Sequence, residues 1–547
     1  MSRAAAARGS SPGEGTTRRA WLWGPALVVL WVLPVVLSWA DSWSLVLPLV
    51  GAAVAYGLSR LEDLEGRRRF LELWALGIGL KWAALIGMVA AQRHVGAVLL
   101  GPDGALYLGR GIELAAAGLV LPESPIALYG THDVGPYYLF AAVITLFGNS
   151  LLTLQTFNAT LSAFIAPLMY SWVRVIVPRH ALAVGLVLAV YPTATFMAVA
   201  DLLKDPAVSV ATVLAVWGAV HLLHGTSTGV VRLATFTVAL ATALGFLHVS
   251  RFYTLFFLLT GVVVAVVVAK RRRMDWPVSA RGLAVVSAAF LLAELAFVPL
   301  GWPTSAEQMW QTTRSVLGTR VDGQNANRAD GVDTVSHAVR AREDRLPTLD
   351  SSLRFAQQTA RPASVFTDAT PEQEAARRGR ASGSARALRV ETEEYRSLPP
   401  PAGFQGRATA LVRKTLGPYV WILPPDYSVR TLLAGDYILY PGMLFWYVLW
   451  PCMFVGLGHA GWQFVRGRAP LMIGSLVVFT SAYLALYLVI NLSYRQRDAI
   501  FPFLLVFAVM GIDVVARRRV LRWAYVLYWL ALVALAAAHL LVRSRLA

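Results

Sequence analysis

The sequence contains a single cysteine, Cys452, among its 547 residues. One cysteine excludes a disulfide within the chain and a metal site built from several thiolates. Because Cys452 lies in an apolar stretch, we interpret it as a small core residue. Charge is scarce as well: Asp, Glu, Lys and Arg together make up 15% of the residues, against about 25% in ordinary globular chains.

Apolar residues replace the missing charge. They account for 57% of the chain, and the mean hydropathy is +0.56. They gather in blocks of roughly 17–25 residues, the length of a helix that crosses a bilayer. This pattern excludes a soluble enzyme, a disordered chain and a fibrous protein, and it predicts an all-α polytopic membrane protein. We expect about 13 transmembrane helices, over residues 21–39, 43–58, 71–91, 152–176, 180–200, 206–224, 230–249, 252–269, 281–300, 436–458, 470–491, 499–516 and 521–542.

The basic residues indicate orientation. Lys and Arg number 49 against 31 Asp and Glu, which gives a formal net charge of +18. The basic runs Arg67–Arg69, Lys270–Arg273 and Arg517–Arg519 lie between apolar blocks without interleaved aromatics, so we expect no nucleic-acid partner. Such runs are typical of cytoplasmic loops. We therefore expect an integral protein of the plasma (inner) membrane with a cytoplasmic N-terminus.

The same pattern predicts the division of the chain. Its expected parts are a disordered cytoplasmic tail at 1–20, a transmembrane hairpin at 21–58, a transmembrane core at 59–300 that contains an outer loop at 92–151, a large and partly flexible extracytoplasmic loop at 301–435, and the last transmembrane helices at 436–547. Within the outer loop, residues 137–147 are apolar but too short to span, so we expect an interfacial or re-entrant helix there.

Three polar clusters fall at the expected outer ends of the helices. In the first, GPDGALYLGRG at 101–111, Asp103 follows a Gly-Pro turn, and Tyr107 and Arg110 come four and seven residues later. This spacing places all three on one face of a helix. Asp103 has the position either of a general base beside the bilayer surface or of a simple helix cap.

The second cluster is DLLKDP at 201–206. Asp201, Lys204 and Asp205 lie on adjacent turns, and Pro206 suits the first turn of the next helix. Lys204 could bind a phosphate while an aspartate orients an acceptor. The alternative is a solvated loop with a local ion pair.

The third cluster is NLSYRQRDAIFP at 491–502. Arg495 and Arg497, like Arg251 in LHVSRFYT, lie on the side that positive charge normally avoids. Arginine forms forked, charge-assisted hydrogen bonds with phosphate. The three arginines therefore indicate an anionic lipid ligand, and the alternative is that their side chains only reach to the interface.

Three further polar residues lie in or beside the expected spans. His221 and His224 share a helix face at an expected cytoplasmic end, without an acid nearby in the sequence, so we interpret them as interfacial histidines and not as metal ligands. Glu294 lies in an outer half-span, where it either reaches the site or forms a structural pair.

Together these segments resemble the GT-C superfamily of membrane glycosyltransferases, which includes protein O-mannosyltransferases and the lipid A aminoarabinose transferase. The resemblance lies in the order of five segments: PDGALYL at 102–108, GPYYLFAAVITLFGNSLLTLQTFNATLSA at 135–163, ADLLKDP at 200–206, SRFYTLFF at 250–257 and RQRDAIFPFL at 495–504.

The resemblance implies a transferase that moves a sugar from a polyprenyl-phosphate-linked donor to a glycan, lipid or protein acceptor on the outer face of the membrane. It matches Asp103 with the catalytic base and Asp201 or Asp205 with a second acidic position. It assigns the lipid phosphate to Arg251, Arg495 and Arg497. Tyr107, Arg110 and Lys204 would complete the substrate site.

No cofactor follows from the resemblance, and a divalent-metal requirement stays open. The alternative functions are a transporter or flippase of lipid-linked saccharides, which would have charged residues in the middle of the bilayer, and a structural membrane protein, which would leave the charged residues scattered.

Overall fold

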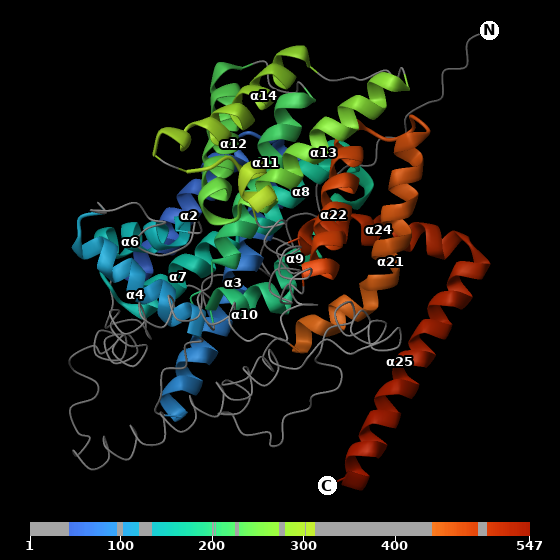
Figure 1. The fold of residues 1–547 in the computed structure, drawn as a ribbon. Helices are drawn as coiled ribbons and strands as arrows, with labels where there is room; N and C mark the ends of the chain where they lie inside the picture. Colours follow the sequence, from blue (N-terminus) through green and yellow to red (C-terminus); the bar gives the residue numbers. More distant parts are fainter. Residues whose placement is uncertain are drawn as a thin grey trace, which may run out of the picture.

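The computed structural model of the protein describes most of the expected transmembrane regions. The described residues are 43–95, 102–119, 134–199, 202, 204–224, 229–272, 279–300, 302–311, 440–490 and 500–546. Within these ranges every regular element is a helix, as the sequence predicts (Figure 1). The tail at 1–20, the expected span at 21–39 and nearly all of the loop at 301–435 lie outside the described residues.

The helices follow the expected apolar blocks closely. Up to residue 199 they are α2 (Trp43–Ser59), α3 (Leu64–Val95), α4 (Pro102–Ala116), α6 (Gly135–Phe147), α7 (Leu151–Ser162), α8 (Ile165–Ile176), η1 (Pro178–His180), α9 (Ala181–Val190) and α10 (Pro192–Val199). After it they are α11 (Asp205–Leu223), α12 (Val230–Ser250), α13 (Phe252–Arg271), α14 (Ala280–Leu295), η2 (Val298–Leu300), α21 (Tyr440–Val465), α22 (Leu471–Ile490), α24 (Phe501–Arg517) and α25 (Arg519–Leu546).

Five described helical segments are long and apolar enough to cross a membrane. They are Leu64–Ala90, Leu151–Ile176, Asp205–Leu223, Val230–Ser250 and Phe252–Arg271. Each coincides with an expected span, which supports a helical membrane protein. The expected total of 13 spans stays a prediction.

Two of the expected spans are interrupted by proline. The span expected at 180–200 divides at Tyr191 into α9 and α10, because Pro192 favours an extended backbone in the residue before it. Within Leu151–Ile176, α7 gives way to α8 at Ala163 and Phe164. Pro167 removes the hydrogen bond to the carbonyl of Ala163 and crowds that carbonyl. Neither span is therefore one straight helix.

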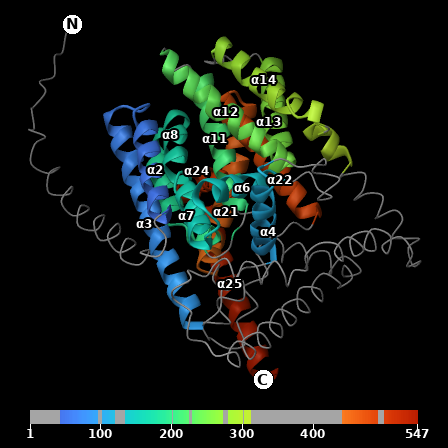
Figure 2. The ribbon, with the colours of Figure 1, turned by 90° about the vertical axis from the view of Figure 1, so that its left-hand side faces the viewer.

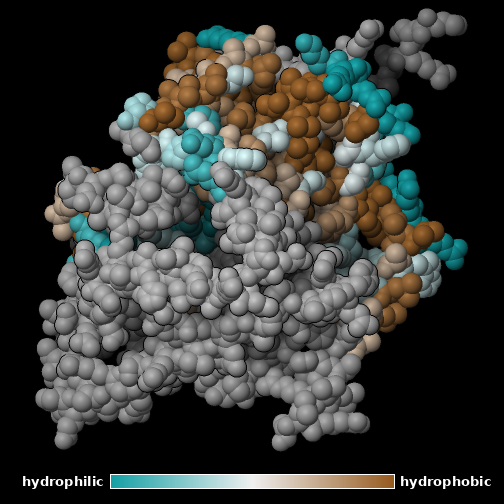
Figure 3. All heavy atoms as spheres, viewed as in Figure 1, coloured by the Kyte–Doolittle hydropathy of each residue, from teal (hydrophilic) through white to brown (hydrophobic). Residues whose placement is uncertain are grey.

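Helix α11 lies at the centre of the bundle. In its most apolar window of 18 residues, 94% of the residues are buried, against 28% in α12 and 39% in α13. It packs against α7, α8, α12 and α14. Helices α12 and α13 thus leave a side for lipid, and Figure 3 shows hydrophobic side chains over much of the upper half of the molecule.

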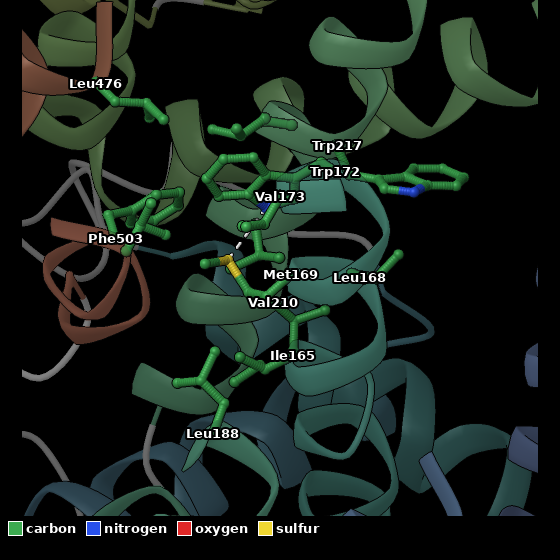
Figure 4. Close-up of a cluster of buried hydrophobic side chains, with 14 of the residues drawn as sticks. Ile165, Leu168, Met169, Trp172, Val173, Leu188, Val210, Trp217, Leu476 and Phe503 are labelled. Atoms are coloured by element: carbon green, nitrogen blue, oxygen red, sulfur yellow. Dashed lines mark hydrogen bonds between the residues drawn. The ribbon is translucent and has the colours of Figure 1, made fainter. Parts of the chain in front are cut away.

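The core is filled by aromatic and aliphatic side chains of α8 and its neighbours (Figure 4). Trp172 of α8 is fully buried and stacks against Phe503 of α24, with 6.2 Å between ring centroids. Its indole Nε1 donates to the sulfur of Met169 at 3.1 Å, which gives the only polar atom of the ring a partner. The stacking of Trp172 on Phe503 joins the first half of the chain to α24.

Helices α4 and α6 form a separate small layer beside the bundle (Figures 1 and 2). Phe140 of α6 packs against Gly111 of α4, and Tyr107 and Tyr137 meet at 5.7 Å between ring centroids. The sequence predicted a short helix at 137–147, and α6 confirms it, with Pro136 in its first turn. Both helices belong to the outer loop that the sequence predicts at 92–151, which contains Asp103.

Candidate functional site

Two residues that the sequence marked separately form one buried ion pair. Nη2 of Arg251 donates to Oδ1 of Asp205 at 2.6 Å, across 46 residues of sequence. Both residues are buried, with 2% of Arg251 and 6% of Asp205 exposed. Removing either member of a buried ion pair is destabilising, because the remaining charge is then buried without a partner.

Helix ends hold this pair in place. Asp205 is the first residue of α11 and is followed by Pro206 in the first turn, as the sequence predicts. Arg251 separates α12 from α13: its N–H donates to Leu247, and its carbonyl accepts from Thr254. Its guanidinium lies 5.8 Å from the ring centroid of Tyr253. An acid in the first turn of α11 also suits the positive end of the helix dipole.

A cavity opens beside Asp205. It has a volume of about 30 Å³ and is lined by Lys81, Ser162, Ile165, Leu188, Tyr191, Ala194, Asp205, Pro206, Ser209, Phe501 and Pro502. Space of this size holds about one or two water molecules, or an oxygen atom of a ligand. Tyr191 and Phe501 stack at 3.9 Å to form one wall.

Lys81 is the residue that the sequence analysis missed. It lies within the candidate span Leu64–Ala90, is 2% exposed, and lines the cavity. No described residue forms a hydrogen bond or ion pair with its ammonium group. The available signal was a lone lysine within the apolar stretch at 71–91, since an ionisable residue at membrane depth indicates function.

Two helices begin at the same cavity. Asp205 and Pro206 open α11, and Phe501 and Pro502 open α24. The first turn of a helix carries a partial positive charge. Arg251 neutralises Asp205. Among the described residues, the cavity therefore combines one ammonium group that has no partner with two positive helix ends, and this electrostatic environment favours an anion.

The remaining expected site residues are described to different extents. Lys204 is described and precedes α11 directly. Asp201, Arg495 and Arg497 lie outside the described residues, so their expected roles stay predictions. Asp103 lies in the first turn of α4, where only its backbone is described.

Tyr107 and Arg110 occupy the helix that the sequence predicted, but they interact differently. Tyr107 is buried against Tyr137 and Phe140. Nη1 of Arg110 donates to Glu113 of the same helix at 2.6 Å. Tyr107 therefore stabilises the small layer formed by α4 and α6.

The layer formed by α4 and α6 lies close to Arg251, the residue between α12 and α13. A Cβ atom on Gly135, the first residue of α6, would collide with Ser250 and Val249 of α12. Arg251 follows directly in the chain. Helix α4, which carries Asp103, packs against α6, and α6 in turn packs against α12.

Two other polar residues, Gln155 and Glu294, have structural partners. Gln155 is buried and donates from Nε2 to the carbonyl of Val199 at 2.9 Å, just before the acidic cluster. Glu294 accepts from the backbone N–H of Ser305 at 2.7 Å and from its hydroxyl group, and lies 4.0 Å from Nδ1 of His248. Of the two alternatives for Glu294, the structural pair is the one observed.

His221 has an acid close by in the structure, although none is near it in the sequence. It is 6% exposed, and its Nε2 lies 3.1 Å from the hydroxyl of Ser171, which in turn donates to Glu62. Trp217 also donates to Ser171, at 2.8 Å. The acid comes from a segment 109 residues away from Ser171, so sequence proximity could not reveal it.

The adjacent acid, Asp63, pairs with Arg174 at the end of α8. The hydrogen bond from Arg174, with a second one from the N–H of Gly66, lowers the pKa of Asp63 below its usual value. These pairs join the start of α3 to the end of α8, at the end of the bundle opposite the cavity.

Within the described part of the chain, no three His, Cys, Asp or Glu side chains gather closely enough to hold a metal ion. No known protein family, curated protein sequence or solved structure matches the chain.

Proposed function

We propose that this protein is a glycosyltransferase that uses a polyprenyl-phosphate-linked sugar on the outer face of the membrane. The observation that carries the proposal is the cavity beside Lys81. One phosphate oxygen of the donor enters this cavity and accepts a hydrogen bond from the ammonium group. An ammonium that is buried without a partner among the described residues is costly, and a bound anion offsets that cost.

The charge distribution along the helices supports a location of the cavity near the outer face of the membrane. Arg67–Arg69 lie in the first turns of α3, and Lys81 follows Arg69 by 12 residues, or about 18 Å along the helix. Helix α13 begins after Arg251 and ends at Lys270 and Arg271. Basic residues therefore mark the helix ends opposite the cavity, and such ends are normally cytoplasmic.

The expected chemistry is a single displacement. The Asp103 carboxylate takes the proton of an acceptor hydroxyl while its oxygen attacks the anomeric carbon of the sugar. The bond between that carbon and the donor phosphate oxygen breaks, and polyprenyl phosphate leaves with the electron pair. The cation at Lys81 stabilises the charge on the departing phosphate. Asp201, Arg495 and Arg497 keep their expected roles beside the donor.

Lys81 also favours a second candidate, a flippase of lipid-linked saccharides, because it lies within a candidate span. The start of both α11 and α24 at the same cavity favours the transferase, since Lys81 is thereby level with helix ends. In a transporter the binding site is expected near the middle of the bilayer.

Reconstitution in vesicles separates the two functions. Purified protein is supplied with polyprenyl-phosphate sugar and a mixture of glycan, lipid and peptide acceptors, and released polyprenyl phosphate is measured by mass spectrometry. Release that depends on both protein and acceptor supports the transferase. Movement of the intact donor between leaflets without release contradicts it and supports the flippase.

A further inference from the structure

Asp205 borders both the cavity and Arg251. Among the described charged residues, Lys81 and Asp205 line the cavity, whereas Arg251 does not. Arg251 reaches this region through its 2.6 Å bond to Oδ1 of Asp205. Asp205 is therefore a lining residue whose carboxylate is bound by the guanidinium of a residue outside the lining.

This arrangement sets an electrostatic condition for anion binding. A carboxylate in the wall of a cavity repels a phosphate oxygen, and the repulsion is strong where water is excluded. Arg251 cancels the negative charge and fixes the carboxylate in one orientation. Lys81 then dominates the charge that a ligand meets.

We propose that Arg251 acts on the anion through Asp205. Arg251 is a positioning residue that neutralises and orients the carboxylate, and it does not itself contact the anion. The proposal rests on the proposed function, because the anion is taken to be a lipid phosphate. It departs from the expectation that Arg251 holds the phosphate directly.

Binding of a polyprenyl monophosphate to the purified full-length protein in nanodiscs tests this proposal. The corresponding uncharged polyprenol is the matched control ligand. We expect Lys81→Met to weaken binding of the phosphate about tenfold or more, as loss of a charged hydrogen bond implies. Arg251→Met should weaken it as well, because the charge of Asp205 is then uncompensated.

The decisive variant is Asp205→Asn combined with Arg251→Met. It removes the repelling carboxylate together with its partner, so we expect an affinity within about threefold of the wild type, as for loss of an interaction that has no net effect. Asp205→Asn alone should bind at least as tightly as the wild type, since Arg251 then adds positive charge. A double variant that binds as weakly as Arg251→Met overturns the proposal and assigns Arg251 a direct contact.

The double variant also provides the test if Arg251→Met fails to fold, since it leaves neither member of the Asp205–Arg251 pair charged and without its partner. Thermal unfolding of every variant is measured in parallel. Equal affinity of the wild type for phosphate and polyprenol, or no effect of Lys81→Met, overturns the anion site and the role of Arg251 together. Weak binding by both Lys81→Met and the double variant overturns only the role of Arg251.

Discussion

Gly456 of α21 and Gly511 of α24 pack backbone against backbone. A Cβ atom on either glycine would lie 2.8 Å from the backbone nitrogen of the other. Small residues allow such close approach of helices within a membrane. Helix α24 begins at the cavity, so this contact sets the position of Phe501 and Pro502 relative to α21.

We expect Gly511→Val to destabilise the protein by about 1–3 kcal/mol or more, since the added side chain forces the two helices apart. Thermal unfolding in detergent measures the effect. Gly458→Val is the matched control, because nothing lies within 4 Å of a Cβ atom at that glycine of α21. Equal loss of stability in both variants would contradict the close packing of α21 and α24.

Lys81→Met should stabilise the ligand-free protein. Methionine fills a similar volume without burying a charge, and the gain is on the order of a few kcal/mol. The melting temperature without ligand is expected to rise, and the further rise on adding polyprenyl phosphate should shrink or disappear. A lower melting temperature without ligand would show that Lys81 has a structural role.

Asp103→Asn should abolish transfer while leaving folding intact. The change keeps the shape of the side chain but removes the base, and loss of a general base costs about 10²–10⁴-fold in rate. The control is Glu113→Gln in the same helix, whose carboxylate is ion-paired with Arg110. Rates are compared under saturating donor. A near wild-type rate for Asp103→Asn would contradict the role of Asp103 as the base and would support its interpretation as a helix cap.

The pair of Asp63 and Arg174 predicts a defined pH dependence. Because the pKa of Asp63 is lowered in the folded protein, its contribution to stability is fully present above the unfolded value of about 3.9. The contribution is lost as the pH falls through the lowered pKa. Unfolding of Asp63→Asn should therefore differ from the wild type at neutral pH and converge with it in acid. A difference that grows in acid would contradict the assignment.

The helices themselves follow from local properties of the sequence. Block length and hydropathy predicted the helices, Pro206 predicted the start of α11, and a short apolar segment predicted α6. Proline could also have predicted the break at Tyr191, because its effect on the preceding backbone is local. The positions of Asp103, Asp205 and Arg251 at helix ends needed no tertiary information.

Only the tertiary structure decided which of these residues meet. Helix α11 is apolar around nearly its whole circumference, so periodicity does not tell which side faces which neighbour. The pairing of Asp205 with Arg251 and the approach of Lys81 to the same cavity depend on how three separate helices pack. The sequence alone determined that polar groups stand at membrane depth, where they need partners. Helix packing determines that Arg251 pairs with Asp205 and that Lys81 lies beside the cavity. Contacts between helices depend on the shapes of the side chains around each helix axis and not on distance along the chain.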